Sequence, residues 1–213
     1  VVRASEKQKQ FITDAGHELK TPITVIDTSL KLLEMEVGQQ KWIDKARAQN
    51  EKLRELVQSG NYGQIRRTNW IITDWYRPQC YYDSGSWRAT WSGEGGGVLL
   101  NQCPHQLDLW QWICGMPVKV HSHMYFGKWH DIEVEDDVSV FCEYKNGATG
   151  TFITSTGDVP GTNRFEIVCD GGTLLTDSKK LWVTKLEVPE SVFTKQNRTA
   201  AFGAPKSEKY EAE

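Results

Sequence analysis

Apolar residues follow two different periods along the chain, and the period changes near residue 60. In residues 1–58 they recur every three or four positions, which is typical of helices that pack through a coiled-coil seam. One seam consists of Ile12, Ala15, Leu19, Ile23, Ile26, Leu30 and Leu33, and the next of Ile43, Ala46, Asn50, Leu53 and Val57. Gly38 lies between the seams and is a suitable helix terminator. The pattern predicts a two-helix hairpin over residues 1–59, whose half-exposed seam would be buried in a homodimeric four-helix bundle.

Beyond Gly63 the apolar positions alternate, as they do in strands. Strands are predicted at 64–73, 118–126, 138–143, 149–155, 164–169 and 181–186, and one helix at 98–114. Residues 60–213 are therefore predicted to form a largely antiparallel open sheet with a packed helix, which makes the chain α+β. The polar tail after Glu190 shows no clear strand, and we interpret it as a truncated end of this domain.

The bulk composition is that of an ordinary globular protein, with 38% apolar and 25% charged residues and a net charge of −3. This charge does not favour nucleic acid as a partner. No apolar run reaches the roughly 20 residues of a membrane span, and no signal peptide opens the sequence. Five cysteines without a close pair indicate buried, reduced thiols rather than a disulfide framework. We therefore expect a cytoplasmic protein.

His17 is the first candidate for chemistry. It lies off the apolar seam of its predicted helix, so its imidazole is expected to face solvent, and Pro22 should bend the helix just after it. A neutral imidazole can act as a nitrogen nucleophile toward phosphorus. The alternative is an ordinary solvent-facing histidine on an amphipathic helix.

The string HELKTP, from His17 to Pro22, resembles the phosphoacceptor motif of sensor histidine kinases. The resemblance implies that His17 accepts the phosphoryl group, that Glu18 assists as a base, and that Thr21 positions water during dephosphorylation. Such kinases bind ATP and magnesium on a separate domain, which we do not find in the sequence. The partners implied are a kinase catalytic domain acting in trans or a response regulator.

The second candidate site centres on Asn101 and His105, which are four residues apart on one helical stripe with Asp108 three residues further. A histidine beside an amide, a carboxylate and a glycine-rich turn suits acid/base work on a hydroxyl group. Just upstream lie the aromatic and cationic residues Tyr82, Trp87, Arg88 and Trp91, which suit a polyhydroxylated ligand. The alternatives are a satisfied polar pair of His105 and Asp108, and core packing of the aromatic residues.

The strings WYRPQ, EGGGVLLNQCPHQLDLWQW and EVEDDV resemble the C-terminal domain of the Gfo/Idh/MocA oxidoreductases over roughly residues 63–203. The resemblance implies that His105 is the acid/base and that Asn101 occupies a position where many members carry aspartate. It also implies a sugar or polyol substrate and an NAD(P) cofactor. The family binds that cofactor on a Rossmann domain with a GxGxxG motif, which we do not find, so we expect no cofactor to be bound by this chain itself.

Two further groups of residues remain to be placed. His121, His123 and His130 suggest a metal, but a third ligand at a recognisable spacing is missing, so no metal site is predicted. The acidic run Glu133–Asp137 is interpreted as a solvated turn.

Two hypotheses follow for the whole chain. The first is a fragment fusion of a phosphoacceptor hairpin with the substrate domain of an NAD(P)-dependent oxidoreductase, without complete enzymatic activity of its own. The second is a two-component signalling protein in which the sheet domain senses a sugar-like ligand and His17 relays phosphate.

Overall fold

The computed structural model describes residues 41–177 and 180–212, and within them one eight-stranded sheet. The strands are β1 (Ile65–Ile72), β2 (Lys119–Phe126), β3 (Glu135–Glu143), β4 (Thr149–Ser155), β5 (Asn163–Cys169), β6 (Gly172–Asp177), β7 (Lys180–Leu186) and β8 (Ser207–Glu211). Their order across the sheet is β2-β3-β4-β1-β5-β6-β7-β8. The sequence pattern predicted β1–β5 and β7 and missed β6 and β8. The first predicted seam, with His17 and Glu18, lies outside the described residues.

The sheet is antiparallel at every junction except one, where β1 lies parallel to β4 and Trp70 pairs with Phe152. β1 is first in sequence but central in space, because the chain leaves it for the helices and for β2–β3 before β4 returns to its side. The prediction of a largely antiparallel open sheet with a packed helix is confirmed.

The helix predicted over 98–114 is two helices, α4 (Val98–Asn101) and α5 (Pro104–Cys114). Pro104 explains the break, because its ring would clash with the carbonyl of Leu100 and it lacks an N–H to continue the ladder. Proline is suited to the first turn of a new helix, which is where it stands in α5. The interruption sets Asn101 and His105 on separate helices.

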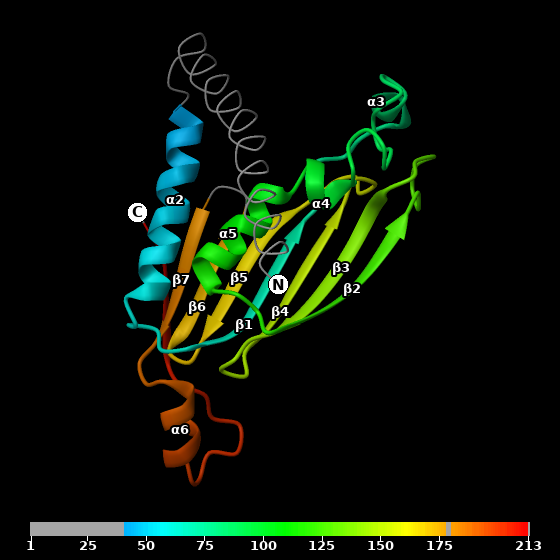
Figure 1. Ribbon diagram of the computed structural model, residues 1–213. Helices are drawn as coiled ribbons and strands as arrows, with labels where there is room; N and C mark the ends of the chain where they lie inside the picture. The colour runs from blue at the N-terminus through cyan, green and yellow to red at the C-terminus, as the bar shows by residue number, and fades with distance from the viewer. Residues whose placement is uncertain (1–40, 178–179, 213) are drawn as a thin grey trace, which may run out of the picture. The chain divides into compact units, whose positions relative to one another are not determined.

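The hydrophobic core lies between the sheet and the helices on one of its faces, α5 and the C-terminal half of α2 (Lys41–Gln58) (Figure 1). Trp70 stacks on Phe165 with ring centroids 4.4 Å apart, and Trp110 of α5 stacks on Phe152 at 5.6 Å. The Trp110 indole N–H donates to Thr68 Oγ1 at 3.0 Å, so the buried polar atoms of this contact are paired. Gly150 lets Trp110 approach, since a Cβ there would come within 2.8 Å of the indole.

α2 forms where the second seam predicted a helix. Its C-terminal part packs into the hydrophobic core of the sheet domain. Leu53 is 1% exposed in the main core cluster, and Leu56 and Val57 pack against that cluster. The Arg54 guanidinium lies 4.1 Å from the Trp112 ring centroid on α5. The compact unit that contains the sheet begins at Gln49, eleven residues before residue 60, where the second domain was predicted to begin.

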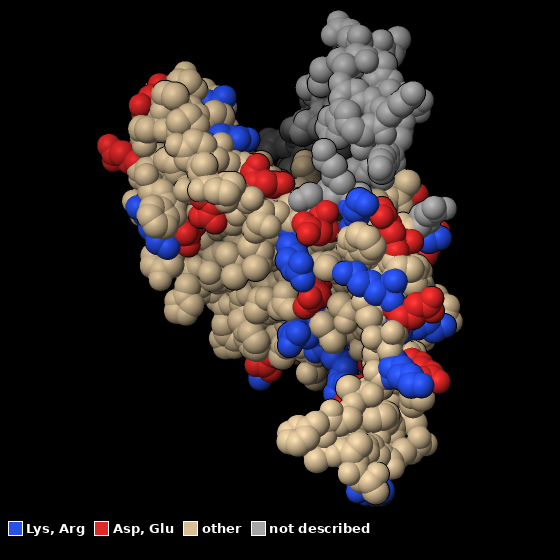
Figure 2. Space-filling view, turned by 180° about the vertical axis from the view of Figure 1, so that it is seen from behind, with Lys and Arg blue, Asp and Glu red and all other residues tan. Residues whose placement is uncertain are grey.

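The opposite face of the sheet carries no helix among the described residues. Figure 2 shows this face, with charged side chains of both signs gathered over one half and few over the other. The charged half includes ion pairs of Glu166 with Arg67 and Arg164, at 3.7 and 3.3 Å. Exposed apolar side chains such as Phe141 and Ile153 belong to the other half of the sheet, on β3 and β4.

The cysteines agree with the expectation of unpaired thiols. All five are free, and only Cys80 is exposed. Burial raises the pKa of the Cys103 thiol to about 12 and that of Cys169 to about 11. Such thiols remain protonated at neutral pH and act as small apolar core residues.

Candidate functional site

The predicted substrate residues of the second half gather at one end of the sheet. They lie on α4, on the start of α5, and in the loops around α3 (Gln79–Tyr82), which extend beyond the ends of β2 and β3 (Figure 1). Asn101, His105, Asp108, Trp87 and Trp91 are exposed there, and Arg88 is half-buried.

The Glu94 carboxylate contacts two of these residues, Asn101 and Arg88. Glu94 Oε1 accepts a hydrogen bond from Asn101 Nδ2 and lies 3.9 Å from Arg88 Nη1, while Glu94 Oε2 accepts from the Ala89 N–H at 2.7 Å. Its side chain is only 10% exposed. Glu94 was not among the sequence candidates, although its place just before the glycine-rich turn is a signal that could have drawn attention to it.

Aromatic rings frame the Arg88 guanidinium, which lies 4.6 Å from the Tyr81 ring centroid and 4.5 Å from that of Trp87. Arg88 Nη1 also donates to the Tyr81 hydroxyl at 3.0 Å. Trp87 is 52% exposed, and Trp91 is 53% exposed beside Phe126, with ring centroids 5.9 Å apart. Flat apolar faces around a fixed cation suit a ligand that offers both C–H surfaces and polar oxygens.

His105 and Asp108 are both exposed on α5, whereas Asn101, which was predicted to share their helical stripe, lies on α4. Asp108 Oδ1 accepts a hydrogen bond from Gln111 Nε2 at 2.9 Å, so the carboxylate is held by its own helix. Asp108 also borders a mostly apolar groove of about 570 Å³ between α5 and strands β2–β3. The groove that Asp108 borders is not lined by Glu94, Asn101 or Arg88.

Tyr82 is placed differently from the other predicted ligand residues. It is 8% exposed, its hydroxyl donates to Thr156 Oγ1 at 3.0 Å, and its ring lies 4.8 Å from that of His130. Burial raises the pKa of the Tyr82 hydroxyl. In this structure Tyr82 supports the loop from inside, and Tyr81 is the tyrosine that contacts Arg88.

The acidic run Glu133–Asp137 is not a solvated turn, and this prediction is wrong. Glu135 is 5% exposed and Asp136 is fully buried, both at the start of β3. Glu135 accepts hydrogen bonds from the Gly97 and Leu99 N–H groups at 2.9 and 3.1 Å, which satisfies the amino end of α4. The run was misinterpreted because charge alone does not reveal how many backbone donors surround a carboxylate.

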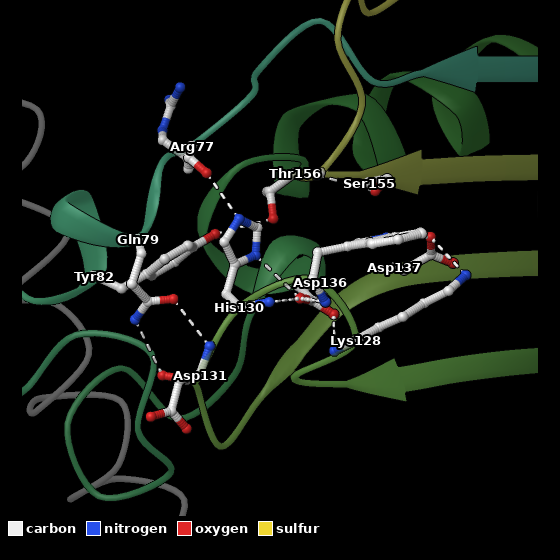
Figure 3. A network of polar contacts seen from close by, with 12 residues as sticks. Arg77, Gln79, Tyr82, Lys128, His130, Asp131, Asp136, Asp137, Ser155 and Thr156 are labelled. Carbon is white, nitrogen blue, oxygen red and sulfur yellow. Dashed lines mark hydrogen bonds and ion pairs between the residues drawn. The ribbon is translucent and has the colours of Figure 1, made fainter.

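Asp136 and His130 form the polar centre that supports the site (Figure 3). The Asp136 carboxylate accepts from the N–H groups of Lys128, Trp129 and His130 at 2.8–3.1 Å, and lies 3.0 Å from His130 Nδ1. His130 Nε2 donates to the Arg77 carbonyl at 2.8 Å. Both ring nitrogens of His130 therefore face hydrogen-bond acceptors. The pair joins the β2–β3 loop to the loop that precedes α3.

The histidines considered for metal binding have different surroundings. His121 and His123 are exposed on β2, whereas His130 is engaged by Asp136 and Arg77. Within residues 41–177 and 180–212, no three His, Cys, Asp or Glu side chains converge as a metal site requires.

The glycine-rich turn before α4 does not fit a dinucleotide. A pyrophosphate would need free backbone N–H groups at the start of a helix. Here the Gly97 and Leu99 N–H groups already bind the Glu135 carboxylate, and a Cβ at Gly97 would come within 1.9 Å of the Glu135 carbonyl oxygen. The Gly97 and Leu99 N–H groups are therefore not free to receive a pyrophosphate.

Comparison with known proteins identifies two families along the chain. The family model "GFO/IDH/MocA C-terminal domain" matches residues 50–175, and the model "His Kinase A (phospho-acceptor) domain" matches residues 7–60. The two matches overlap within α2. Sensor protein DltS of Streptococcus agalactiae serotype V is 33% identical over 52 residues, which is 24% of this chain and 13% of that protein.

Among solved structures, the WlbA dehydrogenase of Chromobacterium violaceum, in complex with NADH and UDP-GlcNAcA, is 30% identical with a TM-score of 0.53, covering 59% of this chain and 36% of its own. The WlbA dehydrogenase of Bordetella pertussis is 27% identical with a TM-score of 0.55, covering 59% of this chain and 38% of its own. Levoglucosan dehydrogenase, in complex with NADH, is 17% identical with a TM-score of 0.57, covering 75% and 43%, and shows the fold alone. The chain thus spans less than half the length of these enzymes.

The histidine-kinase match covers the segment predicted as a phosphoacceptor hairpin, and the oxidoreductase match covers most of the sheet with its site residues. In the part of the chain that the structure describes, no helix has the length and apolar character needed to cross a membrane. Since the matched domain occupies more than half of the sequence, the chain belongs to the GFO/IDH/MocA C-terminal domain family.

Proposed function

We propose that the sheet domain binds an acidic sugar or sugar nucleotide at the end of the sheet that carries Arg88, Asn101 and His105. The observation that carries this proposal is the half-buried Arg88 guanidinium, which is held between the rings of Tyr81 and Trp87 and directed by Glu94. Arginine with a planar fork of donors suits a carboxylate or phosphate, and the exposed tryptophans suit the apolar face of a sugar ring. The WlbA dehydrogenases, which have similar sequences over this domain, bind UDP-GlcNAcA.

Within this proposal His105 is the acid/base toward a substrate hydroxyl, and Asn101 orients that hydroxyl through its amide. An amide can donate and accept hydrogen bonds but does not titrate, so Asn101 cannot pass on a proton. Hydride transfer in this family depends on a nicotinamide placed beside the substrate carbon. For this chain we propose ligand binding and not a complete oxidoreductase activity.

Calorimetry with UDP-GlcNAcA tests the sugar site. We expect binding by the full chain, and we expect Arg88→Ala to weaken it at least about tenfold, because a charge-assisted contact in a partly desolvated site contributes on the order of 1.5–3 kcal/mol. Arg66→Ala is the matched control, since Arg66 pairs with Asp170 and Glu190 near α6 (Glu190–Gln196), away from the site. Equal affinities of the wild type and the Arg88 variant would contradict the proposal.

We further propose that the amino-terminal segment is a phosphoacceptor. It would dimerise through its first seam, Ile12 to Leu33, and His17 would take a phosphoryl group from the catalytic domain of a sensor kinase supplied in trans, with Glu18 as the base. The match of residues 7–60 to the His Kinase A domain supports this assignment.

Labelling with radioactive ATP and an added kinase catalytic domain tests the phosphoacceptor. We expect acid-labile label on the wild type and on His105→Gln, and none on His17→Gln, since only His17 lies in the matched motif. Label incorporated by the chain alone would reveal a nucleotide site that we have not identified. Equal loss of label in both variants would show that the two sites are not independent.

A sensory role is the second candidate function, and the continuity of α2 favours it. This single helix contains residues 50–58, which both family matches share, and its Leu53 is part of the sheet core. Ligand binding to the sheet domain would then alter the phosphorylation rate of His17, which can be measured with and without UDP-GlcNAcA in the same labelling experiment.

A further inference from the structure

Glu94 is contacted by three groups from two parts of the candidate sugar site. Its carboxylate accepts from the Asn101 amide on α4 and from the Ala89 N–H in the aromatic loop, and it attracts the Arg88 guanidinium. A carboxylate that is only 10% exposed is costly unless such donors surround it. The structure therefore shows a reason for a negative charge at position 94.

Ala89 shows how closely the loop depends on this contact. Its φ of 52° lies in the left-handed region, which a non-glycine residue adopts at a cost of order 1–3 kcal/mol. The strained residue is 2% exposed, and its N–H donates to Glu94 Oε2. The same carboxylate thus holds the backbone next to Arg88 and the side chain of Asn101.

An asparagine at position 101 is chemically suited to face the Glu94 carboxylate, because its amide can donate a hydrogen bond. Asn101 donates an N–H to Glu94, whereas an aspartate at the same position would place two carboxylates in hydrogen-bonding contact. Two such groups cannot both ionise at low cost, so one would have to take up a proton. Glutamate at 94 and asparagine at 101 are therefore a matched pair, with the charge on 94.

We propose that Glu94 is a positioning residue of the sugar site, and that the fixed negative charge of the site resides on Glu94 instead of on residue 101. Glu94 orients the Asn101 amide and the Arg88 guanidinium toward the ligand without touching the ligand itself. This inference rests on the proposed function, because it assigns Glu94 its role within the same site.

Exchange of the two side chains tests the pairing. Asn101→Asp should lower the melting temperature of the full chain by about 5 °C at pH 7.5, and by much less at pH 5, where the facing carboxylates can share a proton. Adding Glu94→Gln to this variant should restore the melting temperature, because the new amide at position 94 would accept from the Ala89 N–H and donate to the new carboxylate at position 101. Asn61→Asp is the control, since it makes the same amide-to-carboxylate exchange at an exposed position between α2 and β1, outside the site.

A double variant that melts no higher than Asn101→Asp would overturn the pairing. So would an Asn101→Asp variant as stable as the wild type at both pH values. In the wild type, the side-chain amide NMR signals of Asn101 should shift with pH as Glu94 ionises, and this shift should disappear in Glu94→Gln. A shift that persists in that variant also overturns the proposal.

Ligand binding separates this inference from the proposed function. If UDP-GlcNAcA binds the wild type, Glu94→Gln should weaken that binding at least about fivefold, which the double variant should largely recover. Binding unchanged in Glu94→Gln would overturn the positioning role and leave the sugar site intact. The melting and amide measurements need no ligand, so a failure of UDP-GlcNAcA to bind would count against the proposed function alone.

Discussion

Replacement of Asp136 by alanine is expected to lower the free energy of unfolding by about 3–5 kcal/mol. The change removes a fully buried carboxylate that accepts from three backbone N–H groups and pairs with His130. Those backbone donors and the buried His130 Nδ1 would be left without their acceptor. Urea denaturation followed by tryptophan fluorescence measures the loss.

Asp137 provides the matched control for this experiment. It is the next residue on β3, and its carboxylate contacts Lys128 Nζ at 3.1 Å and Trp129 Nε1 at 2.9 Å close to the surface. Asp137→Ala should cost about 1 kcal/mol or less, as for other ion pairs near solvent. Equal losses in the two variants would contradict the central role of Asp136. If the Asp136 variant does not fold, Asp136→Asn retains the shape while removing the charge.

Leu53→Ala is expected to destabilise the sheet domain by about 2–5 kcal/mol, although Leu53 lies in the segment that also matches the histidine-kinase family. The reason is its burial, since Leu53 is 1% exposed within the main core cluster. Glu51→Ala, at an exposed position of the same helix, should change the stability by less than about 0.5 kcal/mol. Chemical denaturation of both variants gives the comparison.

Sedimentation distinguishes this prediction from the alternative that Leu53 packs in a dimer seam. If Leu53 served mainly a helical bundle, Leu53→Ala would weaken dimerisation and leave the unfolding of the sheet unchanged. That result would contradict the assignment of the C-terminal half of α2 to the sheet domain.

Most of the strands were predictable because their signals are local. Alternating apolar residues identified β1–β5 and β7, and the buried stripe of α5 with Trp110 and Ile113 followed from helical spacing. Asn101, His105 and Trp87, which local signals predicted as site residues, are exposed.

The packing partner of α2 and the buried carboxylates could not be predicted, because they depend on contacts between residues far apart in the sequence. A seam of Leu53 and Val57 has the same spacing whether it faces a second helix or a sheet, so its partner could not be deduced. β6 was missed because its only large apolar residues are the adjacent Leu174 and Leu175, which give no alternation over several positions. The buried roles of Glu94, Glu135 and Asp136 depend on backbone donors that only the folded loops bring together.

The central place of β1 has a consequence for folding during synthesis. Arg67 pairs with Thr149 on one side and Thr68 with Ile167 on the other, so both neighbours of β1 leave the ribosome long after it. The β2–β3–β4 meander has short connections and can close first, because loop-closure entropy grows with the length of the loop. We therefore expect Trp70 and Ile72 to stay exposed in the nascent chain until β5 is made, which makes β1 the segment most in need of chaperone protection.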